Sequence, residues 1–206
     1  MHGAHPQLVR GKLEQLHPTQ ITVGKIEVAC KREEWSKLGK KARKAALDSH
    51  WFPTILGPNG QHYIVDHHHF GLALIEEGVK EVPLLVLKDM SWLEPEIFWN
   101  MMEHNQWTHP YDERGTRRNF TAVPGNLTRL RDDCYRSLAG AVRSAGGYAK
   151  DVAPFSEFLW ADYFRNHISA RRIERDLAGT LAKAVELARS QDARYLPGWV
   201  GTFEAT

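Results

Sequence analysis

Residues 64–78 read IVDHHHFGLALIEEG, a stretch that joins the end of a strand to the start of a helix through a polar cluster. The β-type run at 63–65 leads into Asp66 and three consecutive histidines, and the helical pattern that follows is closed by Gly78. The first backbone N–H groups of a helix have no partner within the helix, and the helix dipole favours an anion there. Histidine can bind a metal ion, donate to an oxyanion or transfer a proton near neutral pH. The stretch therefore predicts a site for phosphate or metal chemistry.

The segments that flank this stretch predict a compact α/β unit. Residues 19–30, TQITVGKIEVAC, predict one strand or a strand pair because they mix β-branched residues with a glycine. Residues 31–48 predict a helix, since Trp35 and Leu38 begin an apolar stripe at helical spacing. The other expected elements are strands at 52–56, 62–65 and 82–87, a turn at 57–60 and a helix at 70–77.

Helices are expected to dominate the chain beyond residue 90. The segment 107–126 is rich in breakers and polar residues, and its length favours a functional loop over a simple connector. We expect an α/β (α+β) fold, with a small α/β domain at 10–90 and a helical region at 91–206 packed on it. Apolar residues recur at helical spacing in 93–106, 127–145, 154–170 and 171–191.

Composition and charge disfavour several classes of protein. The formal net charge of the 206-residue chain is +2, from 27 basic and 25 acidic residues, which does not favour a protein that coats long DNA. The two cysteines, Cys30 and Cys134, form no CxxC pair, so reduced thiols in a reducing compartment are expected. No apolar run reaches the about 20 residues of a membrane span, and the N-terminus lacks a signal-peptide core. These observations predict a cytoplasmic protein with no membrane partner.

The order of these motifs resembles the ParB/sulfiredoxin superfamily. Members of that superfamily carry a turn and helix close to DGHHRxxAxxxxG, and here Asp66, His68, His69, Ala73 and Gly78 match that form. The second half, LRDDCYRSLAGAVRSAGGYAK and PFSEFLWADYFR, resembles the branch known as ParB-like nucleases. The resemblance covers about residues 10–170, and it implies that the α/β domain at 10–90 has the ParB/sulfiredoxin-like mixed-sheet fold.

The resemblance also implies phosphate chemistry. Members include partition proteins that bind and hydrolyse a nucleotide, sulfiredoxins that use ATP, and kinases of free serine that use ADP, so ATP or ADP with Mg²⁺ is the implied cofactor. This chain departs from the family form at two positions, where Phe70 replaces the usual arginine and His67 replaces the glycine. Phenylalanine cannot make the bidentate phosphate contact of arginine. The site therefore either uses other cations or has stopped binding a nucleotide.

Two mechanisms remain open for the histidine cluster. In the first, His67, His68 and His69 bind phosphoryl oxygens while Asp66 acts as a base, usually with Mg²⁺. In the second, Asp66 and His68 hold a divalent transition metal that activates water on a phosphodiester. A plainer alternative is that Asp66 caps the helix and the histidines are partly buried hydrogen-bond partners.

Three residues outside the cluster are further candidates. Glu27, expected on the early strand between apolar neighbours, could line a cleft as a base, or it could be a surface residue. Arg117 and Arg118, in the loop GTRRNF, could bind phosphate in place of the missing arginine, or they could be ordinary exposed loop residues.

The sequence therefore predicts an enzyme of phosphate chemistry. We expect nucleotide-dependent phosphoryl transfer or nucleotide hydrolysis on a small-molecule or nucleotide substrate. The alternatives are a metal-dependent nuclease that hydrolyses phosphodiesters, and a non-enzymatic DNA-binding module of partition type. DNA is a possible partner but is not favoured, because the net charge is close to zero.

Overall fold

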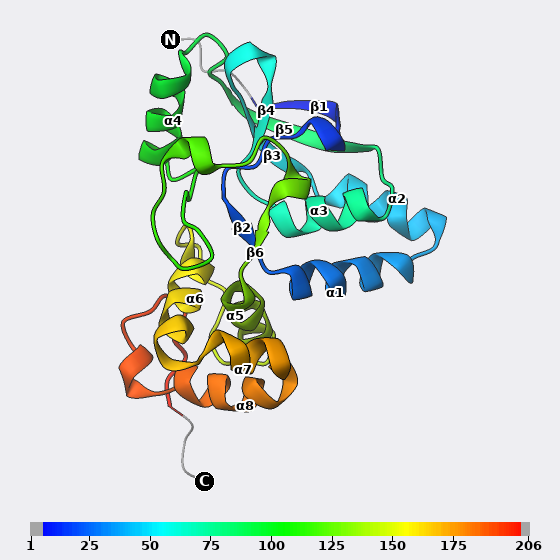
Figure 1. Cartoon of the computed structure of the whole chain (residues 1–206). Helices are drawn as coiled ribbons and strands as arrows, with labels where there is room; N and C mark the ends of the chain where they lie inside the picture. Colours follow the sequence, from blue (N-terminus) through cyan, green and yellow to red (C-terminus); the bar gives the residue numbers. More distant parts are fainter. Residues whose placement is uncertain (1–5, 203–206) are drawn as a thin grey trace. The chain divides into compact units, whose positions relative to one another are not determined.

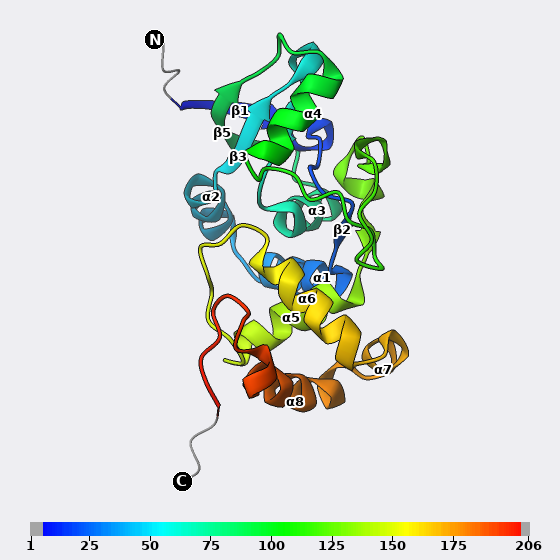
Figure 2. The ribbon, with the colours of Figure 1, turned by 90° about the vertical axis from the view of Figure 1, so that its left-hand side faces the viewer.

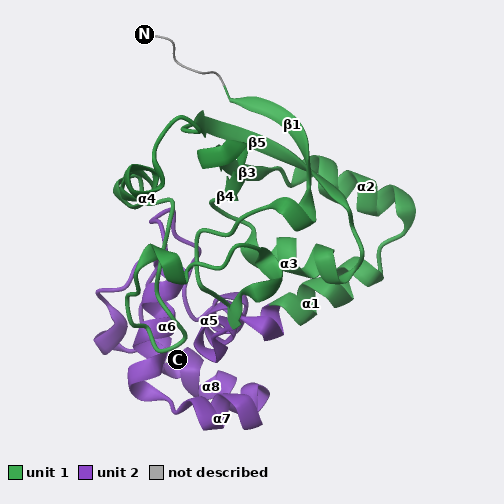
Figure 3. Ribbon diagram, turned by 45° about the horizontal axis from the view of Figure 1, so that its top comes forward, with its two compact units in different colours: residues 1–23, 28–131 green, residues 24–27, 132–206 purple. Residues whose placement is uncertain are grey.

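The structure is a computed structural model that describes residues 6–202 (Figures 1 and 2). The chain forms two compact units (Figure 3). Unit 1 contains residues up to 23 together with 28–131, and unit 2 contains 24–27 together with the chain from 132 onward. The first unit therefore continues well past residue 90, where the sequence had placed the end of the α/β domain.

Unit 1 is built on a mixed four-stranded sheet (Figure 1). The sheet order is β1-β5-β3-β4, in which β5 runs parallel to β3 and antiparallel to β1, while β3 and β4 form an antiparallel hairpin. Asn59 and Gly60 give this hairpin its turn with positive φ values of 59° and 69°. The mixed α/β class is confirmed. The strands are β1 (Gln7–Lys12), β3 (Phe52–Leu56), β4 (His62–Ile64) and β5 (Glu81–Asp89).

The first two helices that contribute to unit 1 differ most from the expected ones. The segment expected to be a single helix at 31–48 forms two helices that separate before Gly39, and the first of them begins at Lys25. Glu27 therefore lies in the first turn of a helix, so its expected place on a strand is wrong. The helices are α1 (Lys25–Ser36), α2 (Lys40–Ser49), α3 (His68–Glu76) and α4 (Pro95–His104).

A distant part of the chain explains the early start of α1. The backbone N–H of Lys25 donates to Asp132 Oδ1 at 2.8 Å, and the N–H of Ile26 donates to Ser137 Oγ at 3.2 Å. These bonds satisfy helix N-terminal donors that would otherwise lack partners. The partners lie more than a hundred residues away in sequence, so local periodicity could not reveal them.

Two apolar clusters fill unit 1. The larger one lies between the sheet and the first three helices, and the smaller one lies under α4. Both include residues beyond position 90, which explains why the unit does not end there. Representative members are Leu13, Phe52, Ile64, Leu74, Leu84, Leu127 and Leu130 in the larger cluster, and Ile55, Tyr63, Met90, Phe98 and Met102 in the smaller one.

Unit 2 is a helical unit in which α5 packs against α6, α7 and α8 (Figure 2). Its core contains Trp160 and Phe164, both fully buried, and Tyr163. The helix expected at 171–191 is broken at Asp176. The helices are α5 (Cys134–Ser144), α6 (Ser156–His167), α7 (Ala170–Arg175) and α8 (Leu177–Ala188).

A short two-stranded sheet lies beside two of the three points at which the chain passes between the units. It pairs β2 (Thr22–Val23) with β6 (Arg131–Asp132). The strand expected over 19–30 is therefore only two residues long. Within residues 6–202, no helix has the length and apolar character needed to cross a membrane.

Candidate functional site

The turn at Asp66 and His67 begins the candidate site. His67 is the N-cap of α3 and adopts the left-handed conformation, with φ 67° and ψ 24°. Its N–H donates to Asp66 Oδ1 at 2.6 Å, its carbonyl accepts the first helical bond from Gly71 N, and its side chain makes no capping hydrogen bond. Few residues other than glycine adopt this conformation, which explains why a glycine stands here in the family form. His67 is thus one of four non-glycine residues with positive φ in the described part of the chain.

His68 fixes a second segment against the start of α3. Its ring is buried, and its Nε2 accepts a hydrogen bond from the backbone N–H of Thr19 at 3.1 Å. Thr19 in turn donates its hydroxyl to the carbonyl of Ile64 at 2.8 Å. Because Nε2 acts as an acceptor, the neutral ring carries its proton on Nδ1. His68 thus positions Thr19 beside the turn, a contact between residues 49 apart in sequence.

Thr19 also holds the loop at 107–126. The hydroxyl of Thr108 and the N–H of His109 both donate to the carbonyl of Thr19, at 2.7 and 3.0 Å. No local pattern in the sequence marks Thr19, because its partners come from distant segments. These bonds hold the loop next to the α3 turn, and its function stays a prediction.

Asp112 organises the same loop from within. Its buried carboxylate accepts hydrogen bonds from the N–H groups of Arg114 and Thr116, at 3.0 and 2.9 Å, and from Arg118. Burial alone would raise the pKa of Asp112, but these hydrogen bonds and the charge of Arg118 together lower it below the ordinary aspartate value. The sequence offered no signal for this role beyond the frequency of aspartate in turns.

The two arginines expected to replace the missing phosphate contact are both engaged in ion pairs. Arg118 Nη2 lies 2.5 Å from Asp112 Oδ2, and Arg117 Nη2 lies 2.5 Å from Glu103 Oε1. The guanidinium carbon of Arg117 also lies 5.5 Å from the ring centroid of Phe120. These contacts order the loop, and phosphate binding by either arginine stays a prediction.

Phe70 packs among aromatic rings at the position where the family form has arginine. Its ring stacks on Phe52 with centroids 6.0 Å apart and approaches Trp35 at 6.1 Å. The His67 ring lies 5.5 Å from Phe52 and 6.2 Å from His50 in the same cluster. Packing has therefore replaced a cation at this point of α3, while the neighbouring imidazole remains beside the helix N-terminus.

Glu27 belongs to unit 2, where its charge acts on Arg136 of α5. A side chain at Gly140 would place its Cβ 3.0 Å from Glu27 Oε2, so the carboxylate would have to shift slightly if the glycine were replaced. Burial lowers the pKa of Arg136 to about 10, and the charges of Asp133 and Glu27 oppose that shift. This setting favours a structural role for Glu27, and its function as a base stays a prediction.

The donor set at the α3 turn does not fit a transition metal, and Mg²⁺ held together with phosphate stays a prediction. Within residues 6–202, no group of three or more histidine, cysteine, aspartate or glutamate side chains is arranged to hold a metal ion. His68 Nε2 already accepts from Thr19 N. Mg²⁺ needs only one or two carboxylates when phosphate oxygens complete its shell, and the exposed Asp66 is the carboxylate at this turn.

Comparison with known proteins places the chain in a family. The family described as "Putative ParB-like nuclease" matches residues 9–166. The crystal structure of protein Atu1540 from Agrobacterium tumefaciens is 43% identical, covers 96% of this chain and 100% of its own, and superposes with a TM-score of 0.89. No curated protein matches the chain. The chain therefore belongs to the ParB-like nuclease family.

Proposed function

We propose that the chain binds a nucleotide phosphate at the Asp66–His67 turn and catalyses phosphoryl transfer or nucleotide hydrolysis there. The observation that carries this proposal is the left-handed backbone of His67 at the N-terminus of α3. Glycine would adopt this conformation without strain, so an imidazole here needs a compensating role. Phosphate at a helix N-terminus, with an imidazole beside it, provides that role.

The residues at the turn can supply the main requirements of phosphoryl transfer. The α3 N-terminus and the His67 and His69 imidazoles would bind phosphoryl oxygens, while His68 would keep Thr19 and its loop in place. The Asp66 carboxylate would accept the proton of the attacking hydroxyl or water, or would hold Mg²⁺ with the phosphates. Bound Mg²⁺ would neutralise charge on the transferred group.

A second candidate is hydrolysis of a phosphodiester in nucleic acid. Membership of the ParB-like nuclease family favours it. The same turn would then bind a phosphate of the strand in place of a free nucleotide. Incubation of the protein with plasmid DNA and with single-stranded DNA and RNA, with and without Mg²⁺, separates this candidate from the first.

Thermal unfolding in the presence of nucleotides tests the first candidate. We expect ADP, ATP, CTP or AMP with Mg²⁺ to raise the melting temperature, since a ligand at 100 times its Kd stabilises the folded state by about 2.7 kcal/mol. His67→Gly, which keeps the turn but removes the imidazole, should reduce that shift, and His69→Ala should do the same. His104→Ala, at an exposed position on α4, is the matched control and should leave it unchanged. The proposal fails if no nucleotide changes the melting temperature, or if both site variants respond like the wild type.

A further inference from the structure

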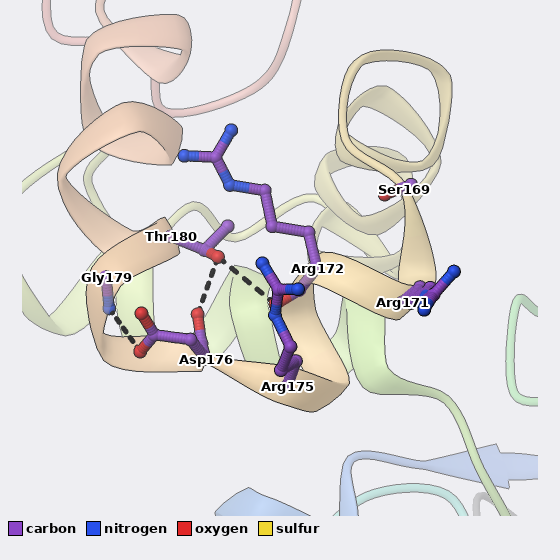
Figure 4. Close-up of a pocket in the computed structure, with 7 residues that line it drawn as sticks. All are labelled: Ser169, Arg171, Arg172, Arg175, Asp176, Gly179 and Thr180. Atoms are coloured by element: carbon purple, nitrogen blue, oxygen red, sulfur yellow. Dashed lines mark hydrogen bonds between the residues drawn. The ribbon is translucent and has the colours of Figure 1, made fainter.

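A polar pocket lies at the turn between α7 and α8 in unit 2 (Figure 4). Its volume is about 520 Å³, within the range of ligand sites in proteins. The lining contains three arginines and no aromatic or aliphatic side chain. The lining residues are Ser169, Arg171, Arg172, Arg175, Asp176, Gly179 and Thr180.

Hydrogen bonds within the turn hold the frame of this pocket. Asp176 Oδ1 accepts from Gly179 N at 2.8 Å and thereby caps α8. The buried hydroxyl of Thr180 donates to the carbonyl of Asp176 at 2.6 Å. A Cβ at Gly179 would lie 2.1 Å from Asp176 Oδ2, so glycine lets the cap close tightly. The backbone that carries the arginines is therefore preorganised.

The arginines of the pocket differ from the other arginines near α5 and α6. Arg143 pairs with Glu157, and Arg165 pairs with Asp133 at 2.6 Å and with Asp162. Arg171, Arg172 and Arg175 are exposed, and within residues 6–202 none of them has an ion pair. In Figure 4, Arg172 and Arg175 extend from α7 on the side of Thr180, whereas Arg171 points away from them. The pocket therefore carries three guanidinium groups. The acid among its lining residues is Asp176, and its carboxylate caps α8.

We propose that this pocket binds the phosphate backbone of a nucleic acid. Guanidinium groups suit phosphate because their planar N–H donors can form two parallel hydrogen bonds to it. The lining offers no ring on which a nucleobase could stack, which favours backbone phosphates over a free nucleotide. Contacts of this kind position a strand without reading its sequence. The inference rests on α7 and α8 alone and does not depend on the function proposed for the α3 turn.

Salt-dependent binding to a labelled DNA duplex tests the inference, with the single strand of the same sequence measured in parallel. For duplex DNA, log K decreases with log salt, and the magnitude of this slope is smaller by about 0.9 for each phosphate contact that is lost. Arg172→Ala/Arg175→Ala should therefore reduce the slope by about 2 and weaken binding at least about tenfold at low salt. Arg172→Lys/Arg175→Lys, which keeps the charges but loses the planar donors, should retain most of the slope with an intermediate affinity.

Lys40→Ala/Lys41→Ala is the matched control, because it removes two exposed charges from α2 in unit 1. This control should bind as the wild type does, and each variant should keep the wild-type melting temperature. The inference is overturned if the wild type binds neither strand form, or if the control loses as much affinity as the arginine variant. Binding to polyglutamate that equals binding to DNA would also overturn it, because the pocket would then recognise negative charge and not phosphate. Binding that is unchanged in Arg172→Ala/Arg175→Ala would place the contact elsewhere.

Discussion

At the residue scale, the conformation of His67 connects the sequence to the proposed site. The imidazole replaces a glycine of the family form, and the structure gives that position φ 67°, where glycine has no steric penalty. The sequence alone could show the substitution but not its conformational free energy, because that energy depends on a backbone angle. The strain at this residue is what motivates the proposed site at this turn.

His67→Ala and His67→Gly should differ in stability although both remove the ring. Alanine carries a Cβ into the left-handed conformation at a cost of about 1 kcal/mol, and glycine does not. We therefore expect His67→Gly to have a free energy of unfolding about 1 kcal/mol higher than His67→Ala in urea titrations. Both should lose the contact of the ring with Phe52 equally. Equal stability of the two variants would contradict the left-handed assignment of this residue.

Asp112 should make the stability of the protein depend on pH in the acid range. Its pKa is lower in the folded state than in the unfolded chain, since its hydrogen bonds outweigh the effect of burial. The carboxylate therefore contributes stability above the ordinary aspartate pKa of about 4, and that contribution is lost as the pH falls through the folded-state value. Asp112→Asn should be less stable than the wild type at pH 7, and this difference should shrink below about pH 4.

Chemical denaturation at a series of pH values measures that difference directly. Asp192→Asn, at an exposed position, controls for the loss of one negative charge. A difference in the free energy of unfolding between Asp112→Asn and the wild type that stays constant from pH 7 to pH 3 would contradict the lowered pKa of Asp112.

At the scale of elements, the sequence predicted what is encoded locally. The strand at 52–56 was placed with the bounds it has, because its apolar residues and flanking turn signals are contiguous. The strand β1 was not predicted, since its residues are mostly exposed and only its backbone pairing with β5 defines it. The Asp66–His69 cluster was found because its members are adjacent. Thr19 was missed because His68 reaches it across 49 residues.

The break between α7 and α8 was also missed, although a local cap produces it. Asp176 separates two helices that share one amphipathic pattern, and it caps the second through Gly179 N. The same break brings the arginines of RRIER to a pocket, whereas helical periodicity alone indicated only a charged face. A cap in the middle of a periodic segment can therefore alter the functional interpretation of the residues beside it.

Gly179→Ala should destabilise the protein by about 1–2 kcal/mol, the usual value of a lost N-cap. The added methyl group cannot coexist with the Asp176 carboxylate in its capping position. Ala178→Gly is a useful comparison, because it changes an exposed neighbour and leaves the cap in place, so it should cost only the lower helix propensity of glycine. Thermal unfolding of both variants measures the effect. A Gly179→Ala protein as stable as the wild type would show that the cap contributes little.

At the scale of the whole molecule, the two compact units place the boundary at 131 and not at 90. Leu127 and Leu130 belong to the larger apolar cluster of unit 1, and Phe98 and Met102 belong to the smaller one. The sequence indicated a change of character near residue 90 because helices follow strands there. Secondary-structure type does not reveal which core a residue fills, so the boundary could not be predicted from it.

Two fragments can test the position of the boundary. Residues 1–131 retain both apolar clusters of unit 1 and should show cooperative thermal unfolding by circular dichroism. Residues 1–90 lack several fully buried members of those clusters, and losing even one such side chain typically costs 2–5 kcal/mol, so this fragment should not unfold cooperatively. Hydrogen exchange adds a finer test, because the longer fragment lacks Asp132 and Ser137, which accept from the first N–H groups of α1. The amides of Lys25 and Ile26 should therefore exchange faster in the longer fragment than in the full chain, while those of β3 stay protected. Cooperative unfolding of residues 1–90 would instead support a domain that ends where the helices begin.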